Sequence, residues 1–96
     1  MPLTVIAEIA AKPGKEEELR ARLVSMIEPT RAEEGCVQYD LHVSNSEPGR
    51  FFFLETWTSD EVLDRHLASP HLKAFASAAP DLLGEPLRVV RATRIG

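Results

Sequence analysis

Two histidines in the second half of the chain are the side chains best suited to acid–base chemistry. His66 and His71 lie in the segment HLASPHL, and imidazole titrates nearer to neutral pH than other side chains. His66 follows Leu63 at helical spacing and can face inward, either as a proton acceptor or as a hydrogen-bonded structural histidine. His71 follows Pro70 in the first turn of a predicted helix, where the helix dipole favours a neutral imidazole. For His71, a role as base and a role as exposed capping residue both remain open.

A carboxylate and an indole lie two residues apart in the segment RFFFLETWT, residues 50–58. Because its neighbours are apolar, burial should raise the pKa of Glu55 unless an arginine compensates. A paired structural carboxylate is the commoner arrangement, with Arg50, Arg88 or Arg91 as the partner. Trp57 offers a flat wall and an N–H donor that can orient an aromatic ligand, and packing in the core or an interface is its alternative role.

Two further aromatic residues complete the set of candidate site residues. Tyr39 can present a hydroxyl to a pocket, or it can serve in cross-strand packing. Phe75 is expected to line the pocket or the core. These residues would place acid–base groups beside apolar walls.

Other kinds of site find little support in the sequence. Cysteine and histidine do not occur at zinc-ligand spacing, and a helix break separates His66 from His71, unlike the helical H-E-x-x-H motif. Neither a dinucleotide-binding nor a nucleotide-phosphate glycine loop appears. We expect neither a metal nor an organic cofactor.

Alternating and helical patterns define the elements that must position these residues. Strands are expected where apolar residues alternate, and helices where they recur at helical spacing. Ser59 and Ser69 are expected helix caps, Pro29 should interrupt the first helix, and Gly35 should end it. The predicted order is strand 3–11, helix from 15, strand 36–44, strand 50–58, helix 60–68, helix 71–79 ending near Pro80, and strand 87–95. This order predicts an α+β, ferredoxin-like antiparallel sheet with helices on one face.

The strands are apolar on both faces, which predicts association with a second copy of the chain. Phe51, Phe53 and Trp57 share one face of the third strand, whereas Phe52 and Leu54 occupy the other. A single helical layer covers only one face, and a large exposed apolar patch usually marks an interface. We expect a homodimer through the sheets, with helices that wrap further round the sheet as the alternative.

Size and charge restrict the class of protein. The 96 residues suit a single domain spanning 1–96, with a core over about 3–95. The net charge of −4 and the scattered basic residues argue against a binder of nucleic acid or anionic membranes. No apolar stretch approaches the ~20 residues of a membrane span, and the single cysteine fits a reducing compartment. A cytoplasmic location is the expectation.

The segment ETWTSDE (55–61), followed by HLASPHL (66–72), resembles the central motif of the antibiotic biosynthesis monooxygenase family. The opening VIAEIAAKPGKEEE and the segment EEGCVQYDLHV are similar to its bacterial quinol-monooxygenase branch. The resemblance covers nearly the whole chain. It implies a dimeric α+β barrel in which each subunit holds a separate pocket between sheet and helices.

Oxygenase members of this family act on phenols or dihydroxy-aromatics without flavin, haem or metal. The haem-degrading branch relies on an asparagine in its first strand, where this chain has Ala7-Glu8-Ile9 instead. The resemblance therefore implies a cofactor-free monooxygenase or oxidase that uses O2 on a small phenol or quinol. In this hypothesis His66 or His71 accepts the phenolic proton, Trp57 orients the ring, and Glu55 orients or balances charge. A non-catalytic dimeric ligand-binding or stress-related module and an isomerase of the same fold are the alternatives.

Overall fold

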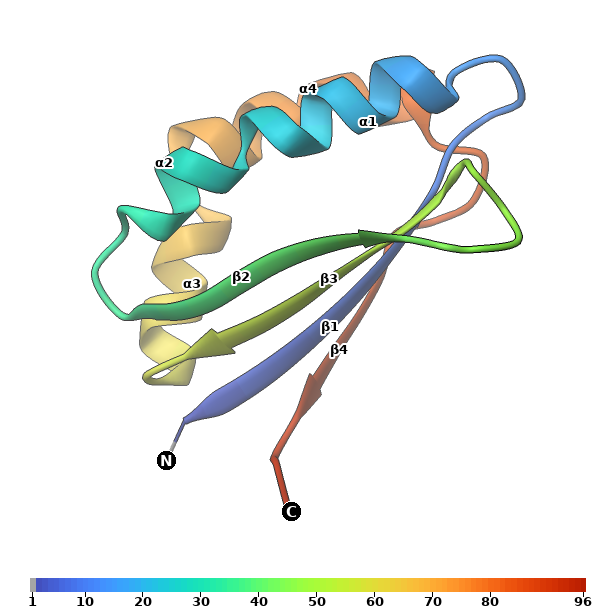
Figure 1. Ribbon diagram of the computed structural model, residues 1–96. Helices are drawn as coiled ribbons and strands as arrows, with labels where there is room; N and C mark the ends of the chain where they lie inside the picture. The colour runs from blue at the N-terminus through green and yellow to red at the C-terminus, as the bar shows by residue number, and fades with distance from the viewer. Residues whose placement is uncertain (1) are drawn as a thin grey trace.

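The four strands of the computed structural model, which describes residues 2–96, form an antiparallel sheet in the order β2-β3-β1-β4. Helices cover one face of this sheet (Figure 1). The elements are β1 (Leu3–Ala10), α1 (Glu16–Ser25), α2 (Ile27–Arg31), β2 (Cys36–Val43), β3 (Arg50–Trp57), α3 (Asp60–Leu67), α4 (Pro70–Leu82) and β4 (Arg88–Ala92). The predicted α+β, ferredoxin-like fold is confirmed.

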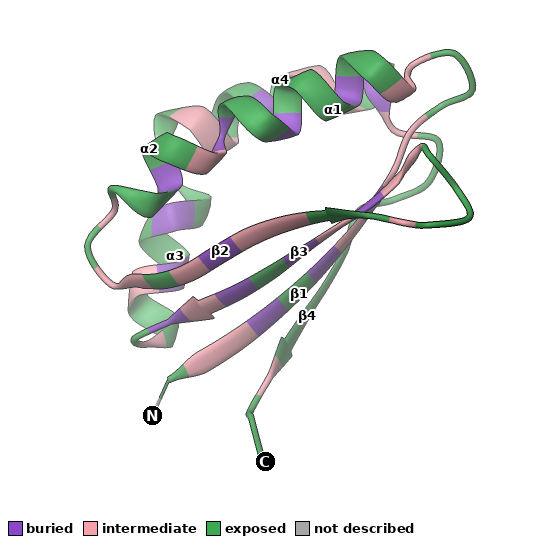
Figure 2. Cartoon of the chain, in the orientation of Figure 1, coloured by how far each residue is buried: buried purple, intermediate pink, exposed green. Residues whose placement is uncertain are grey.

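Alternation along the two central strands places the candidate site residues on the face that the helices cover. In β3, Phe51, Phe53, Glu55 and Trp57 are buried, whereas the intervening residues are partly or fully exposed. The same alternation runs along β1, where Val5 pairs with Glu55 across the ladder. Buried and more exposed positions alternate visibly along these strands in Figure 2. The period of two thus directs Glu55 and Trp57 inward.

Two serine caps fix the starts of the helices that carry the histidines. The Ser59 hydroxyl accepts a hydrogen bond from the backbone N–H of Val62 at 3.2 Å and begins α3. The Ser69 hydroxyl accepts one from the N–H of Leu72 at 3.4 Å, with Pro70 at the first helical position of α4. Each cap satisfies an amide that has no partner within its helix. Both predicted caps are confirmed.

Gly35 makes the sharp bend between α2 and β2. Its φ of +87° lies in the left-handed region, and a Cβ there would come within 2.5 Å of Val62 Cγ1. The Gly35 carbonyl also accepts a hydrogen bond from the Thr58 amide at 3.0 Å. This close packing brings the loop before β2 against the start of α3.

Several sequence-based boundaries were wrong. The first helix is interrupted at Met26 rather than at Pro29, which lies inside α2, and α2 ends at Arg31 rather than at Gly35. The last helix does not end near Pro80 but continues to Leu82, because Lys12 provides partners for its final carbonyls. The Lys12 ammonium donates to the Pro80 carbonyl at 2.7 Å, and the Lys12 amide donates to the Leu82 carbonyl at 2.8 Å. The final strand covers only Arg88–Ala92, since this edge strand pairs with β1 alone and that pairing ends at Thr4.

The face of the sheet away from the helices keeps apolar side chains at its surface. Ile6, Leu54 and Val90 are 43%, 37% and 38% exposed, and no element among residues 2–96 packs over them. The helices therefore do not wrap round to this face. No helix among the described residues is long and apolar enough to cross a membrane.

Candidate active site

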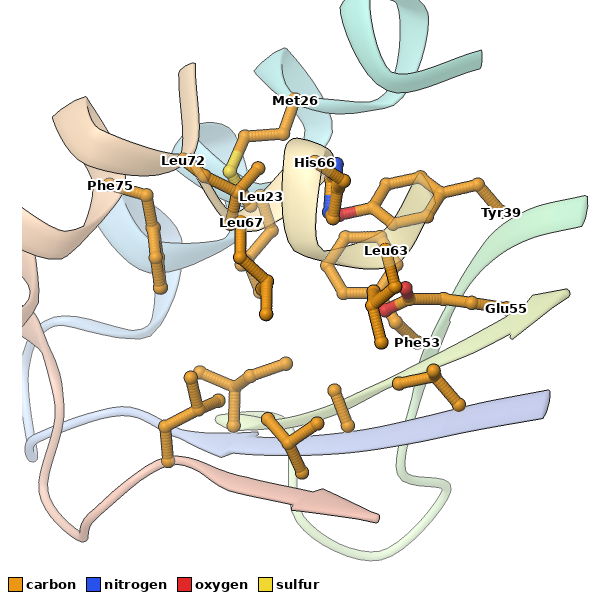
Figure 3. Close-up of a pocket in the computed structure, with 15 residues that line it drawn as sticks. Leu23, Met26, Tyr39, Phe53, Glu55, Leu63, His66, Leu67, Leu72 and Phe75 are labelled. Atoms are coloured by element: carbon orange, nitrogen blue, oxygen red, sulfur yellow. The ribbon is translucent and has the colours of Figure 1, made fainter. Parts of the chain in front are cut away.

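A cavity of about 60 Å³ lies between the sheet and the helices. Its walls are largely aliphatic and aromatic, and its ionisable lining side chains are Tyr39, Glu55 and His66. Figure 3 shows these three side chains on one side of the space and the ring of Phe75 on the other. The predicted residues Tyr39, Phe75, Glu55 and His66 therefore share one pocket.

Glu55 has a tryptophan N–H, not an arginine, as its partner. The indole Nε1 of Trp57 donates a hydrogen bond to Glu55 Oε1 at 2.8 Å. Only 5% of Glu55 is exposed, and burial raises the pKa of its carboxyl to about 7, although the Trp57 hydrogen bond lowers it. The carboxyl is thus able to exchange a proton near neutral pH.

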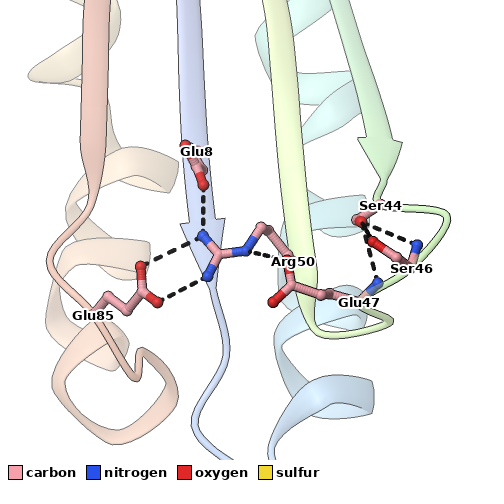
Figure 4. A network of polar contacts seen from close by, with 6 residues as sticks. All are labelled: Glu8, Ser44, Ser46, Glu47, Arg50 and Glu85. Carbon is pink, nitrogen blue, oxygen red and sulfur yellow. Dashed lines mark hydrogen bonds and ion pairs between the residues drawn. The ribbon is translucent and has the colours of Figure 1, made fainter.

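None of the three arginines expected as partners of Glu55 pairs with it, so that expectation is corrected. Arg50 binds three carboxylates at the other end of the sheet, those of Glu8, Glu47 and Glu85 (Figure 4). Arg91 pairs with two acidic residues at the surface of α3. Arg88 lies in β4 and is exposed. The register explains the outcome for Arg50, which is five residues from Glu55 along β3 and points to the opposite face.

Trp57 is fully buried and lies behind the pocket rather than in its wall. Its ring lies 4.5 Å from the imidazole of His66, measured between centroids, and its N–H is used by Glu55. The expectation that Trp57 stacks on a ligand therefore does not fit this cavity, whose lining residues do not include it. Its contacts are instead with Glu55 and His66.

His66 projects from α3 into the pocket and is held by Glu33. Its Nδ1 lies 2.8 Å from Glu33 Oε2, and only 2% of the residue is exposed. A carboxylate oxygen can only accept, so Nδ1 carries the hydrogen and Nε2 keeps its lone pair. Burial lowers the pKa of His66, which favours the neutral imidazole. His66 thus offers the pocket an acceptor nitrogen.

His71 contacts the same oxygen of Glu33 but does not line the cavity. Its Nε2 lies 2.8 Å from Glu33 Oε2 and 3.3 Å from the Ser69 hydroxyl. The structure thus brings the two predicted histidines together through a carboxylate that the sequence reasoning missed. Glu33 is 33 residues from His66 along the chain, so no local spacing relates them.

The remaining polar lining residue, Tyr39, stacks on Phe53 with ring centroids 4.4 Å apart. Burial raises the pKa of the Tyr39 phenol, so its hydroxyl stays protonated in the physiological range. The cavity therefore combines flat apolar surface with a hydroxyl, a carboxyl and an imidazole acceptor. These groups can take a proton from the hydroxyl group of a bound ligand, and the cavity of about 60 Å³ must widen to admit an aromatic ring.

Comparison with known proteins gives a consistent family assignment. The model of the family described as antibiotic biosynthesis monooxygenase matches residues 2–78. The solved structure of Rv0793 from Mycobacterium tuberculosis has 36% sequence identity and a TM-score of 0.93, covering 100% of this chain and 97% of that one.

Two curated relatives extend the comparison. The protein sll1783 of Synechocystis is 36% identical over 88 residues, covering 92% of this chain, and this chain spans 60% of that relative's length. YgiN of Escherichia coli, described as a probable quinol monooxygenase, is 29% identical over 100 residues, covering 93% of this chain and 96% of YgiN. On the family match and these similarities, the chain belongs to the antibiotic biosynthesis monooxygenase family.

Proposed function

We propose that this protein is an enzyme that oxidises a small phenol or quinol with O2 and without an organic or metal cofactor. One observation carries the proposal: Glu55 lies in the wall of an apolar cavity and forms no ion pair with any lysine or arginine among residues 2–96. The pKa of its carboxyl, about 7, suits a group that accepts a proton from a bound hydroxyl. The family membership and the description of YgiN support the same class of reaction.

The chemistry requires an electron-rich substrate, because ground-state O2 is a triplet and reacts with organic molecules by single-electron steps. Loss of the hydroxyl proton turns a phenol into a phenolate, which gives up an electron more readily. In the monooxygenase reaction one oxygen atom enters the ring and the other leaves as water. A quinol and O2 thus become a hydroxyquinone and water, and the electrons lost by the quinol reduce both oxygen atoms.

The side chains divide these tasks. Glu55 accepts the first proton, while Nε2 of His66, on the same side of the pocket, accepts a hydrogen bond or a second proton. Tyr39 and Phe75 contact the aromatic ring and exclude water. Trp57 holds the Glu55 carboxyl in place through its N–H. A dry pocket strengthens each of these polar interactions.

A second copy of the chain completes the proposed enzyme. The exposed apolar side chains of Ile6, Leu54 and Val90 lie on the face of the sheet opposite the pocket. Pairing two such faces would remove this surface from water while leaving one pocket in each subunit. The proposed assembly is therefore a homodimer through the sheets.

The test is O2 consumption by chelator-treated protein with a panel of hydroquinones and polycyclic phenols, corrected with heat-denatured protein. We expect saturable O2 uptake above the rate of autoxidation. In His66→Ala this uptake should fall while the variant keeps the oligomeric state of the wild type. Glu28→Gln, at an exposed position on α2 that does not line the pocket, provides the control and should leave the rate unchanged. Ligand binding without turnover would contradict the proposal and favour a binding module. Turnover that needs no O2 would favour an isomerase.

A further inference from the structure

Glu33, His66 and His71 form a cluster of metal-ligand type beside the pocket. One ligand atom from each of the three side chains lies within 4.8 Å of those of the other two, and Glu33 Oε2 lies 2.8 Å from both His66 Nδ1 and His71 Nε2. The three residues come from the loop before β2, the last turn of α3 and the first turn of α4. Segments distant in sequence therefore converge on one point.

We propose that this cluster binds a divalent transition-metal ion of borderline softness, with Zn²⁺ as its representative. Two imidazoles and a carboxylate are ligands that Zn²⁺ accepts, and three protein ligands leave a position for water. In a tetrahedral site with bonds of about 2.0–2.1 Å, ligand atoms lie about 3.3 Å apart. Glu33 Oε2 lies 2.8 Å from each nitrogen, so binding of the ion requires the carboxylate to move outward slightly.

The burial pattern gives the ion a route from solvent. The side chains of Glu33 and His71 are 20% and 21% exposed, whereas that of His66 is 3% exposed. Of the three residues, only His66 lines the cavity. The ion would therefore enter from the surface and sit behind His66, outside the space that the aromatic substrate occupies.

Metal binding at this position changes what His66 presents to the pocket. In the metal-free arrangement Nδ1 donates to Glu33, and Nε2 keeps a lone pair. An ion on Nδ1 takes that nitrogen's lone pair, so the proton of the neutral ring must move to Nε2. His66 then becomes a hydrogen-bond donor and can no longer accept a substrate proton. If the proposed oxidation is correct, the ion is a reversible inhibitor of it.

The site itself is tested by binding, independently of activity. Tag-free, chelator-treated protein is titrated with Zn²⁺ by calorimetry and with Co²⁺ by visible absorption. We expect one ion per chain and a ligand-field spectrum of low-coordinate Co²⁺ with nitrogen and oxygen donors. Glu33→Gln and His71→Ala should each weaken binding at least about 10-fold, whereas His42→Ala, which alters the one histidine outside the cluster, should bind normally.

The position of the proton provides a second readout. Long-range ¹H–¹⁵N spectra should show His66 protonated at Nδ1 without the ion and at Nε2 with Zn²⁺. Absence of saturable binding, or binding that Glu33→Gln and His71→Ala leave intact, would overturn the proposal. Both readouts work without substrate. A protein that binds Zn²⁺ but shows no O2 uptake would therefore refute the proposed oxidation while supporting the proposed metal site.

Discussion

Replacing Glu55 by glutamine should stabilise the fold at alkaline pH while removing the proposed base. Glutamine has the shape of the protonated carboxyl, and its amide oxygen can still accept the hydrogen bond from Trp57. The folded state raises the pKa of Glu55 from 4.5 to about 7, so it retains this proton where the unfolded chain has lost it. The folded state thus binds more protons between these values, and the free energy of unfolding falls as pH rises through this window.

The size of the effect follows from the shift. Each pKa unit corresponds to 1.36 kcal/mol, so burial of the ionised carboxylate costs the wild type about 3 kcal/mol above pH 7. Because only part of this cost is present at pH 5, the stability gain of Glu55→Gln should grow by about 2–3 kcal/mol between pH 5 and pH 8.

Urea unfolding followed by the fluorescence of Trp57, the single tryptophan, measures this difference at both pH values. Protein concentrations must be equal, since dimerisation would make stability concentration-dependent. Glu28→Gln, at an exposed position, is the matched control and should change stability by at most about 0.5 kcal/mol. A gain for Glu55→Gln that is equal at pH 5 and pH 8, or a loss at pH 8, would refute the reasoning.

Three further predictions concern positioning and assembly. Trp57→Phe removes the hydrogen bond that lowers the pKa of Glu55, so the pH–rate profile should move to higher pH, and an unchanged profile would count against this contact. Gly35→Ala forces a side chain into the left-handed region and against Val62, so urea unfolding should show a loss of about 1–3 kcal/mol, whereas wild-type stability would contradict the bend described. Leu54→Lys places a charge on the proposed dimer face, and sedimentation should show a monomer; an unaltered dimer would exclude this face.

The fold was predictable because its signals are local. Alternation along residues 50–58 identified the strand and the face that carries Glu55, and both helix caps follow from a serine before a helical pattern. The errors lie at chain segments whose ends depend on tertiary contacts. Lys12, far from α4 in sequence, provides partners for the end of that helix beyond Pro80.

The candidate site was predictable in its members but not in its connections. The residue types of His66 and Glu55 indicated proton transfer, and the structure brings both to one cavity. The partner of each could not be read from the sequence. Glu33 reaches His66 through the packing of a loop against α3, and Trp57 reaches Glu55 through a side-chain hydrogen bond along one strand. From the sequence alone, the carboxylate of Glu33 or of Glu55 could equally have paired with an arginine.

The central claim is that Glu55 takes a proton from a phenolic substrate that then reacts with O2. The most direct test measures kcat/KM for O2 uptake against pH in wild type and Glu55→Gln, with chelator-treated protein. The account predicts a wild-type rate that rises through about pH 7 as Glu55 ionises, and a loss of at least about 100-fold in the folded variant. A variant that retains the wild-type rate and pH profile would contradict the claim.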